Sequence, residues 1–427
     1  MKIQRIRIAT FIIALAAVSW LFQVLASTAQ SVPTVPSDVW IADRTDGQPG
    51  SGTNTDPYDG STQARFDAIM AGISATNVII HIGEGTFQTQ GTVTWRPKDG
   101  WTISGAGTYL TTLQQTVLSD ANILGGQNQV IGGLVNNVVV ENLTVDCNYI
   151  ALAPGQTSNN KAIQAVGVAS GRISNVRVLH SGGTSETFAL GFFQSGIGSI
   201  PPNFVLIENC RVEQSGPNVT AIWASNSQTN DNSDSMPEGR QAIIRNCYVE
   251  GTGSPSTAGI AFQINGYQSG VIEGCYTTGC LYPVYRDTLP QTNLEIVNNT
   301  IFSLANGITI TGNPTTAYTN NVLIVGNAIS APNAGVALLN AVTNAVISNN
   351  RIIDGGGGSH FGFYFAGSGV NGITVTGNVL DASLTLFNTA LNVTFCLNRT
   401  PTGEPVPGVP DNCDQLAVSC PLCPLLP

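Results

Sequence analysis

The apolar and polar positions of the chain repeat a six-residue pattern, Ile/Val–x–Asn/Gly–x–x–apolar/Thr, from residue 140 onward. Nine copies read VENLTV from Val140, ISNVRV from Ile173, IENCRV from Ile207, IRNCYV from Ile244, IEGCYT from Ile272, IVNNTI from Ile296, IVGNAI from Ile324, ISNNRI from Ile347 and VTGNVL from Val375. A tenth, degenerate copy, VTFCLN, begins at Val393, and the starts from 244 to 375 lie 28, 24, 28, 23 and 28 residues apart. A period in the twenties with Asn/Gly turns predicts an all-β solenoid in which each coil buries one apolar stripe.

The hexapeptide also predicts a register for the coils. Its first two residues should end one strand, the next two should form a tight turn, and the last two should begin the following strand. Stacked coils lie about 4.8 Å apart, so equivalent side chains form columns. The fourth position gives the column Leu143, Val176, Cys210, Cys247, Cys275, Asn299, Asn327, Asn350, Asn378 and Cys396. Its asparagines predict a hydrogen-bonded ladder.

The three cysteines of this column, Cys210, Cys247 and Cys275, are interpreted as buried free thiols that act as small hydrophobic side chains. Parallel side-chain directions and an odd count make a disulfide among them awkward. No CxxC pair or histidine accompanies them, which disfavours a metal site. The second position carries Glu208 and Arg245, followed by Glu273, and so predicts a charge ladder on the outer surface.

These repeats, with their Asn-bearing turns, resemble the right-handed parallel β-helix of the pectate lyase-like superfamily over roughly residues 38–400. The entry segments DGSTQARFDAIMAGI, VIIHIGEGTF and WTISGAGTYLTTL are similar to the N-terminal coils of that superfamily. The resemblance implies an amphipathic helix that caps the open end of the solenoid. Phe66, Ile69, Met70 and Ile73 have the spacing that such a cap requires.

The N-terminus has the pattern of a secretory signal peptide. Lys2, Arg5 and Arg7 precede an uncharged run from Ile8 to Ala26, with small residues at a cleavage site near Ala29. An uncleaved membrane anchor is the alternative, because the run is long. We therefore expect a signal peptide over residues 1–29, the β-helix over 30–400 and a Pro/Cys-rich tail over 401–427, in a secreted or cell-surface protein.

The composition and net charge of the chain disfavour some classes of binding partner. Only 10% of the 427 residues are charged and 42% are hydrophobic, which argues against disorder. Loss of the three N-terminal cations would leave 13 basic and 26 acidic side chains, a net charge of 13 − 26 = −13. This charge disfavours nucleic acid and anionic membranes, and it opposes a polyanion unless bound cations assist. We expect a monomer.

The tail holds Cys413, Cys420 and Cys423, and Cys396 lies just before it. In a secreted protein, disulfides are expected there. Four cysteines allow three pairings, and the sequence does not choose among them.

The strand that precedes each hexapeptide carries the candidate chemistry. If Ile222, Ile260, Val284, Ile308, Val336 and Phe363 point inward, their successors Trp223, Ala261, Tyr285, Thr309, Ala337 and Tyr364 point outward. The exposed aromatics suit stacking on sugar rings, and surface aromatics shielded by loops are the equally weighted alternative. Trp223, Gln263 and Tyr364 are the predicted substrate-binding residues.

The segment VYRDTL at 284–289 is the densest polar cluster on this strand, and Tyr285, Arg286 and Asp287 are the predicted catalytic residues. Arg286 has the parity of an inward position, where an unpaired guanidinium is costly, so a bulge or a carboxylate partner is expected. An ion pair that stabilises a bent coil is the structural alternative. Asp231, Asp234 and Glu238, in the long loop 226–240, are candidate calcium ligands, although a solvated acidic loop explains them as well.

Two functions remain open. The resemblance implies a carbohydrate-active enzyme, either a polysaccharide lyase that uses a base and often calcium, or a hydrolase with grouped aspartates. The hydrolase signatures DD and GHG are absent from the sequence, as are the WIDH and RxPxxR signatures of pectate lyases. Candidate bases are Tyr285, Arg286, Lys161, His180 and His360. The second function is a non-catalytic surface, adhesive or structural β-helix that binds glycans along the aromatic positions.

Overall fold

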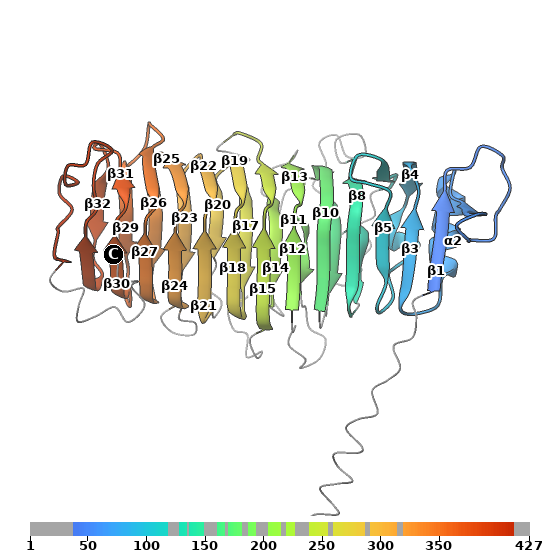
Figure 1. The fold of residues 1–427 in the computed structure, drawn as a ribbon, viewed down its shortest axis with the longest axis horizontal. Coiled ribbons are helices and arrows are strands. Elements are labelled where there is room, and N and C mark those ends of the chain that lie inside the picture. Colours follow the sequence, from blue (N-terminus) through green and yellow to red (C-terminus); the bar gives the residue numbers. More distant parts are fainter. Residues whose placement is uncertain are drawn as a thin grey trace, which may run out of the picture. The chain divides into compact units, whose positions relative to one another are not determined.

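A chain of stacked coils runs from the N-terminal helix to the last strand in the computed structural model (Figure 1). The structure describes residues 37–117, 128–134, 136–148, 160–166, 170–181, 187–193, 204–214, 219–226, 239–254, 259–286, 291–313 and 319–413. Asp38–Pro427 form one compact unit, to which the following account applies. The predicted signal segment, residues 1–29, lies outside the described residues. None of the described helices is long and apolar enough to cross a bilayer.

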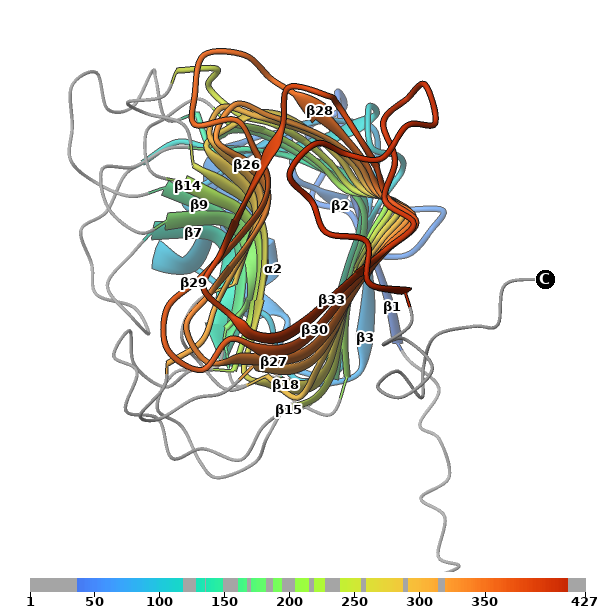
Figure 2. The same cartoon turned by 90° about the vertical axis from the view of Figure 1, so that its left-hand side faces the viewer.

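All the strand pairs between neighbouring coils are parallel, and the described strands form two sheets. The ten-stranded sheet lies on one side when the solenoid is viewed along its stack (Figure 2). Its strands are β7 (Asn128–Leu134), β9 (Asn160–Val166), β11 (Thr187–Phe193), β14 (Val219–Ser225), β17 (Ile260–Asn265), β20 (Tyr282–Arg286), β23 (Asn306–Thr311), β26 (Ala334–Leu339), β29 (Phe361–Ala366) and β32 (Thr385–Asn388).

The larger sheet, of 23 described strands, is folded at the hexapeptide turn. Before the turn or across it lie β1 (Ser37–Ala42), β3 (Val78–Ile82), β5 (Thr102–Gly105), β8 (Val138–Asp146), β10 (Ser170–Ser181), β12 (Phe204–Glu208), β15 (Gly239–Arg245), β18 (Tyr267–Glu273), β21 (Asn293–Val297), β24 (Thr319–Val325), β27 (Val342–Ser348), β30 (Asn371–Thr376) and β33 (Leu391–Cys396). The others are β2 (Tyr58–Asp59), β4 (Gly85–Thr89), β6 (Thr111–Gln115), β13 (Arg211–Gln214), β16 (Tyr248–Glu250), β19 (Tyr276–Cys280), β22 (Thr300–Ser303), β25 (Ala328–Ala331), β28 (Arg351–Asp354) and β31 (Val379–Leu380).

The predicted turn is confirmed at the third position of the hexapeptide. Asn209, Asn246 and Asn298 have φ of 53°, 52° and 56°, and Gly274 has 61°. Asn and Gly are the residues that accept this left-handed conformation with little strain, which explains their alternation at this position. The strand before the turn and the strand after it can therefore meet at a sharp angle without losing register.

The asparagine ladder is also confirmed. Asn299 Nδ2 donates to Asn327 Oδ1 at 2.9 Å, and the same bond repeats from Asn327 to Asn350 and from Asn350 to Asn378. Each acceptor oxygen also receives the backbone N–H of the preceding rung, at 2.9 Å for Asn299 N to Asn327 Oδ1. Each Nδ2 reaches a backbone carbonyl as well, such as Ile272 O from Asn299. The buried amides are thus fully bonded, as buried polar groups must be.

The predicted free thiols fill the same column upstream. Cys210, Cys247 and Cys275 are buried and free, as expected. Burial in apolar surroundings raises the pKa of the Cys247 thiol well above its usual value. The two halves of the column meet where Cys275 N donates to Asn299 Oδ1 at 2.8 Å.

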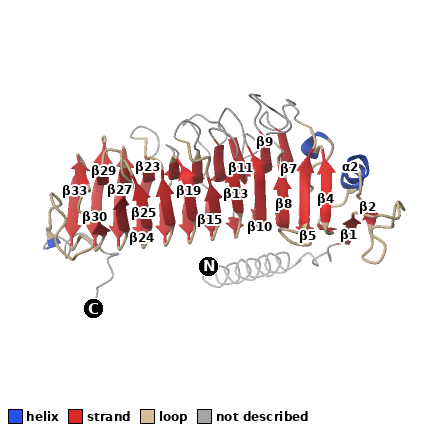
Figure 3. Ribbon diagram, turned by 90° about the horizontal axis from the view of Figure 1, so that it is seen from above, coloured by secondary structure: helices blue, strands red, loops and turns tan. Residues whose placement is uncertain are grey.

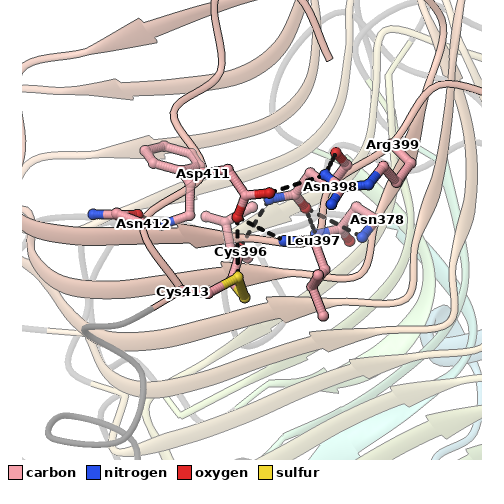
Figure 4. Close-up of a disulfide and its surroundings, with 10 residues drawn as sticks. Asn378, Cys396, Leu397, Asn398, Arg399, Asp411, Asn412 and Cys413 are labelled. Carbon is pink, nitrogen blue, oxygen red and sulfur yellow. Dashed lines mark hydrogen bonds and ion pairs between the residues drawn. A yellow bond between two sulfur atoms is a disulfide. The ribbon is translucent and has the colours of Figure 1, made fainter. Parts of the chain in front are cut away.

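The last rung corrects the sequence prediction. Cys396 is not in this column; the ladder continues from Asn378 to Asn398, with Nδ2 and Oδ1 2.9 Å apart. Cys396 pairs with Thr376 in the sheet register, so the final copy reads FCLNRT and not VTFCLN. Cys396 instead forms a disulfide with Cys413, beside which Asp411 accepts from Leu397 N and pairs with Arg399 (Figure 4). A tail disulfide was expected; Cys420 and Cys423 lie outside the described residues.

The capping helix is present as α2 (Gln63–Gly72), at the end of the solenoid opposite β33 (Figure 3). Thr62 caps it by accepting the backbone N–H of Arg65. Phe66 and Met70 are buried, and Ile69 and Ile73 pack against the core, as the spacing predicted. The helix covers the apolar interior of the first coils.

The predicted charge ladder is confirmed in part. Arg245 pairs with Glu208 at 2.7 Å, and Arg172 pairs with Glu141 and, at 3.9 Å, with Glu208. Glu273 has no ion pair among the described residues. The ladder therefore joins the coils from β8 to β15 and ends before the asparagines begin.

Candidate functional site

The outer face of the ten-stranded sheet carries two columns of side chains, here called the first and the fourth column, whose members in one strand lie three residues apart in sequence. In four strands these two residues touch. Lys161 Nζ and Gln164 Oε1 lie 3.3 Å apart, and Asn306 Nδ2 donates to Thr309 Oγ1 at 3.3 Å. The rings of Tyr282 and Tyr285 lie 5.8 Å apart, and those of Phe361 and Tyr364 5.3 Å apart.

The residues between these two positions face the core. Ala162, Ile163 and Val284 are buried, and a Cβ added to Gly307 would lie 2.3 Å from Ile329. Residues three apart therefore share the outer face, although simple alternation would place them on opposite sides. In these four strands the corner brings two side chains into contact on the outer face.

Register gives the order of the fourth column as Gln164, Gly191, Trp223, Gln263, Tyr285, Thr309, Ala337, Tyr364 and Phe387. The prediction that Ala261 belongs to this set is wrong. Ile222 pairs with Phe262, so the neighbour of Trp223 is Gln263, and Ala261 is fully buried. Gln263, predicted to bind substrate, lies between Trp223 and Tyr285 on successive rungs.

Trp223, Gln263 and Tyr285 thus form one row, here called the Trp–Gln–Tyr row. Trp223 and Tyr285 are half-buried and Gln263 is 5% exposed. Two rungs separate the aromatic residues, a spacing of about 10 Å. Tyr282 of the first column packs against Tyr285 at an interplanar angle of 46°. An amide flanked by aromatic rings offers both stacking and hydrogen bonding to one elongated ligand.

Lys161 lies farther along the same face, two rungs before Trp223. It is 5% exposed, and this burial lowers the pKa of its ammonium group to about 7. Gly191 occupies the rung between Gln164 and Trp223 and adds no side chain there. A lysine with this pKa is partly unprotonated at neutral pH and can accept a proton. Lys161 is thus a candidate base from the sequence whose pKa burial lowers toward neutrality.

The aromatic residues at the other end of this face are arranged differently. Tyr364 and Phe387 stack at 4.6 Å with an interplanar angle of 14°, and Phe361 packs against both. Thr309 and Ala337, 2% and 1% exposed, separate them from Tyr285. The predicted Tyr364 therefore lies on the same face as Trp223 but belongs to a separate cluster of rings that cover one another.

Most of the predicted catalytic and metal-binding side chains lie outside the part of the chain that the structure describes. Arg286 pairs in register with the buried Ile310, in an inward column as its parity predicted, and its side chain lies outside the described residues. Asp287 is likewise outside them, as are the predicted calcium ligands Asp231, Asp234 and Glu238. These assignments stay predictions.

Each of the three histidines has an aspartate partner. His180 Nδ1 lies 2.8 Å from Asp146 Oδ1, and Asp146 also accepts from Gln114 and from the backbone of Asn148. His360 Nδ1 lies 2.8 Å from Asp354 Oδ2. His81 pairs with Asp38 at 3.1 Å. His180 lies at the end of β10 and His360 directly precedes β29, and their aspartate partners hold the two rings in position.

Sequence reasoning missed a second aromatic group on the opposite side of the turn. Tyr248 and Tyr276 stack at 5.1 Å and 2°, with the Arg211 guanidinium 4.5 Å from the centre of the Tyr248 ring and Phe302 next to Tyr276. The signal was present, because Arg211, Tyr248 and Tyr276 share the fifth position of the hexapeptide. Their ring faces are turned to one another along the stack, so this group presents ring edges to solvent.

Among the described residues, one group of possible metal-ligand side chains lies close together. It consists of Cys396, Asp411 and Cys413. Its two sulfurs are joined in the disulfide of Figure 4, which leaves the Asp411 carboxylate alone. A disulfide sulfur is no thiolate ligand. This cluster therefore does not fit a metal ion.

Comparison with known proteins identifies the fold. No protein-family model matches the sequence, and no curated protein matches it. The Dettilon tailspike protein is similar in structure, with a TM-score of 0.59 and 14% identity over 80% of this chain and 64% of that one. A double mutant of the tailspike protein of E. coli bacteriophage HK620 has a TM-score of 0.51 and 11% identity over 85% of this chain and 75% of its own. This chain thus spans just under two thirds of the Dettilon protein. Together with the parallel sheets, these similarities show that the chain has a right-handed parallel β-helix fold.

Proposed function

We propose that this protein is a secreted, monomeric polysaccharide-binding β-helix protein that holds a glycan along the outer face of the ten-stranded sheet. The observation that carries the proposal is the Trp–Gln–Tyr row on successive strands β14, β17 and β20. The signal peptide predicted at residues 1–29 supports secretion. Two tailspike proteins with the same fold support the architecture and nothing finer.

The chemistry of the row suits a sugar chain. Sugar rings present apolar C–H faces and hydroxyl edges, which match half-buried aromatic rings and a primary amide. The rungs repeat at about 4.8 Å, so a chain that runs along the stack meets a new pair of outer residues at each step. The net charge of −10 favours a glycan of low charge density over a dense polyanion.

A binding experiment tests this role. Trp223→Ala and Tyr285→Ala should each weaken binding to the preferred polysaccharide at least about tenfold, because each removes a stacking platform. Tyr276→Ala is the matched control, since Tyr276 is an exposed tyrosine outside the ten-stranded sheet. Affinity electrophoresis against a panel of neutral and acidic polysaccharides gives the readout. Equal affinity of all three variants would exclude the row as the glycan site.

A second candidate function, cleavage of a uronate-containing polysaccharide by β-elimination, is favoured by Lys161. Elimination needs a base for the proton next to the uronate carboxylate, and a lysine with a pKa of about 7 can serve. Tyr285 lies on the same face, and the predicted catalytic group Tyr285–Arg286–Asp287 remains the alternative source of the base. Calcium, if held by Asp231, Asp234 and Glu238 as predicted, would offset the negative charge of protein and substrate.

Product formation separates the two candidates. Elimination yields unsaturated ends that absorb in the ultraviolet, whereas hydrolysis yields reducing ends alone. Lys161→Met should abolish elimination if Lys161 is the base, and Tyr285→Phe or Arg286→Ala should do so if the predicted group is. Glycan binding without product from any polysaccharide leaves the binding function alone.

A further inference from the structure

A pocket of about 280 Å³ lies at the N-terminal end of the solenoid, away from the ten-stranded sheet site. It is formed between α2 and the segment that follows the short 3-10 helix η1 (Gly91–Val93). Its lining residues are Met70, Ala71, Thr92, Val93, Thr94, Trp95, Arg96 and Lys98. Two of these residues are cations, and the lining contains no carboxylate.

Arg96 and Lys98 point to the same side of the chain. Both are exposed, whereas Trp95 and Pro97 are buried, which is the alternation of an extended segment. The residue before a proline is held extended, so Pro97 fixes this geometry at Arg96. Residues two apart in an extended chain lie about 7 Å apart, close enough for both side chains to reach one small anion.

Neither cation has an ion-pair partner among the described residues. Arg44, Arg65, Arg172, Arg177, Arg211, Arg245 and Arg399 all pair with carboxylates. The carboxylates nearest to the pocket in sequence are engaged elsewhere. Asp99 accepts from the backbone and side chain of Asn136, and Asp67 accepts from Thr89 and Gln90. In a chain with a net charge of −10, two adjacent unpaired cations in one pocket are an exception.

The rest of the lining suits a ligand with an apolar part. Met70 and Trp95 are 1% and 3% exposed and close the inner wall, and Val93, 42% exposed, forms part of the rim. Thr94 Oγ1 donates to Gly91 O, so its proton is already used. The donors left for a ligand are therefore the guanidinium and the ammonium group, which favour an oxyanion over a neutral hydroxyl.

We infer that this pocket binds one oxyanionic group, a carboxylate, sulfate or phosphate, between Arg96 and Lys98, with the attached carbon skeleton against Met70 and Trp95. The shared chemistry is a small oxyanion. It can be carried by an acidic sugar or be free in solution. The inference does not depend on the Trp–Gln–Tyr row, because no residue is common to both sites.

The test measures ligand binding to the full mature protein by calorimetry at low salt. The probes are trigalacturonate, N-acetylglucosamine 6-sulfate and inorganic phosphate, with galactose as the neutral control. We expect an oxyanionic probe to bind, galactose not to bind, and affinity to fall as salt is added. The sugar probes and phosphate distinguish a glycan-borne anion from a free one.

Matched variants separate a site from a general charge effect. The double variant Arg96→Gln/Lys98→Gln should lose at least about tenfold in affinity, because both charge-assisted hydrogen bonds are removed. The double variant Arg240→Gln/Arg351→Gln removes two exposed cations outside the pocket and should change affinity less than about twofold. Equal losses in the two double variants would overturn the inference.

The same variants exclude a purely structural role. The two cations lie near the C-terminal end of α2, whose free carbonyls attract positive charge. If the only role of the two cations were to interact with the C-terminal carbonyls of α2, the variant Arg96→Gln/Lys98→Gln would have a lower melting temperature. No oxyanionic probe would then bind the wild-type protein. That result would also overturn the inference, and it would leave the proposed glycan row untouched.

Discussion

One column of the solenoid is filled by apolar residues and thiols in its first half, here called the thiol half, and by amides in its second, the amide half. Cys210, Cys247 and Cys275 occupy the position that Asn299 and its successors hold. Each thiol reaches a backbone carbonyl of the preceding coil at only 3.7–3.8 Å, whereas each amide bonds to the next amide and to a carbonyl at 2.8–2.9 Å. The position demands a small side chain, and the amides join successive coils by shorter hydrogen bonds than the thiols do.

The outer face of the ten-stranded sheet also differs between the thiol half and the amide half. Over the thiol half it carries Lys161 and the Trp–Gln–Tyr row; over the amide half it carries small residues and the stacked Tyr364 and Phe387. In the thiol half, coils are joined at the surface by the Glu141–Arg172–Glu208–Arg245 ladder. The candidate site thus lies over the half whose interior column lacks an amide ladder, and the half with the ladder carries small residues and one cluster of stacked rings.

The largest expected effect comes from breaking the amide half. Asn350→Leu should lower the free energy of unfolding by about 4 kcal/mol, because the buried Asn327 N–H loses its acceptor and both Asn378 Oδ1 and Ile324 O lose their side-chain donor. Denaturant unfolding measures the change. The exposed Asn388→Leu, which removes one bond to Ala390 N, should cost less than about 1 kcal/mol. A similar loss in both would mean that the ladder adds no special stability.

The next effect has the opposite sign and lies in the thiol half. Lys161→Met should raise the free energy of unfolding at neutral pH by roughly 3 kcal/mol, because the buried ammonium group is replaced by an apolar side chain. The folded pKa of about 7 lies below the unfolded value, so the unfolded chain binds the extra proton between these pKa values. Wild-type stability should therefore rise with pH from about 7 to about 10, and the variant should lose this rise.

Chemical unfolding across that pH range gives the measurement. Conversion of Gln164 to Leu, beside Lys161, is the control, since it should leave the pH dependence in place. A wild-type stability that is flat above neutral pH would contradict the buried, neutral lysine.

A smaller effect tests whether the amide ladder can be extended. In Cys275→Asn, the new Nδ2 would meet Asn299 Oδ1 and Ile244 O, and its oxygen would meet Cys247 N, as at every asparagine rung. We expect a gain of about 1 kcal/mol. Cys210→Asn places the amide between Val176 and a thiol, without an amide neighbour, and should destabilise. A gain at both positions would show that rung order does not matter.

The smallest expected effect concerns the last turn. Leu397 has φ of 54° at the third position, where the other described copies have Asn or Gly. Leu397→Gly should relieve left-handed strain and raise stability by about 1 kcal/mol. Leu397 is 46% exposed, so little packing is lost. Leu391→Gly, on an exposed leucine in strand β33, should instead lower stability, and thermal unfolding of both variants would distinguish strain relief from loss of a surface leucine.

The hexapeptide predicted the turns, the ladder and the thiol column, and the spacing of apolar residues from Phe66 to Ile73 agreed with a capping helix, because each of these features depends on residues close in sequence. The two errors of register share one cause. Ile260 was aligned with Ile222, whose partner is Phe262, and Cys396 was placed where Asn398 lies. Both are slips of two residues, and a period of two keeps the inward or outward direction unchanged through such a slip. Alternation therefore predicts the face of a side chain but not its neighbour on the next rung.

The remaining site features depend on contacts that no local pattern contains. The corner that turns Lys161 and Gln164 to the same side becomes visible only from the burial of Ala162 and Ile163 between them. The shifted pKa of Lys161 arises from burial, which depends on the whole chain. The unpaired state of Arg96 and Lys98 likewise requires knowledge of where Asp99 and Asp67 direct their oxygens.

The uniform direction of the asparagine ladder makes one coil an interchangeable unit of length. Residues 328–350 carry the chain from one ladder position to the next, and β24 pairs with β27 at a constant offset of 23 residues. Excision of that segment would join Asn327 to Arg351, bring Asn327 opposite Asn378, and shorten the solenoid by about 4.8 Å. In such a molecule, equivalent side chains would still stack on one another in every column. Descendants of this protein can therefore grow or shrink by whole coils in its C-terminal half, while the candidate site in the other half stays unchanged.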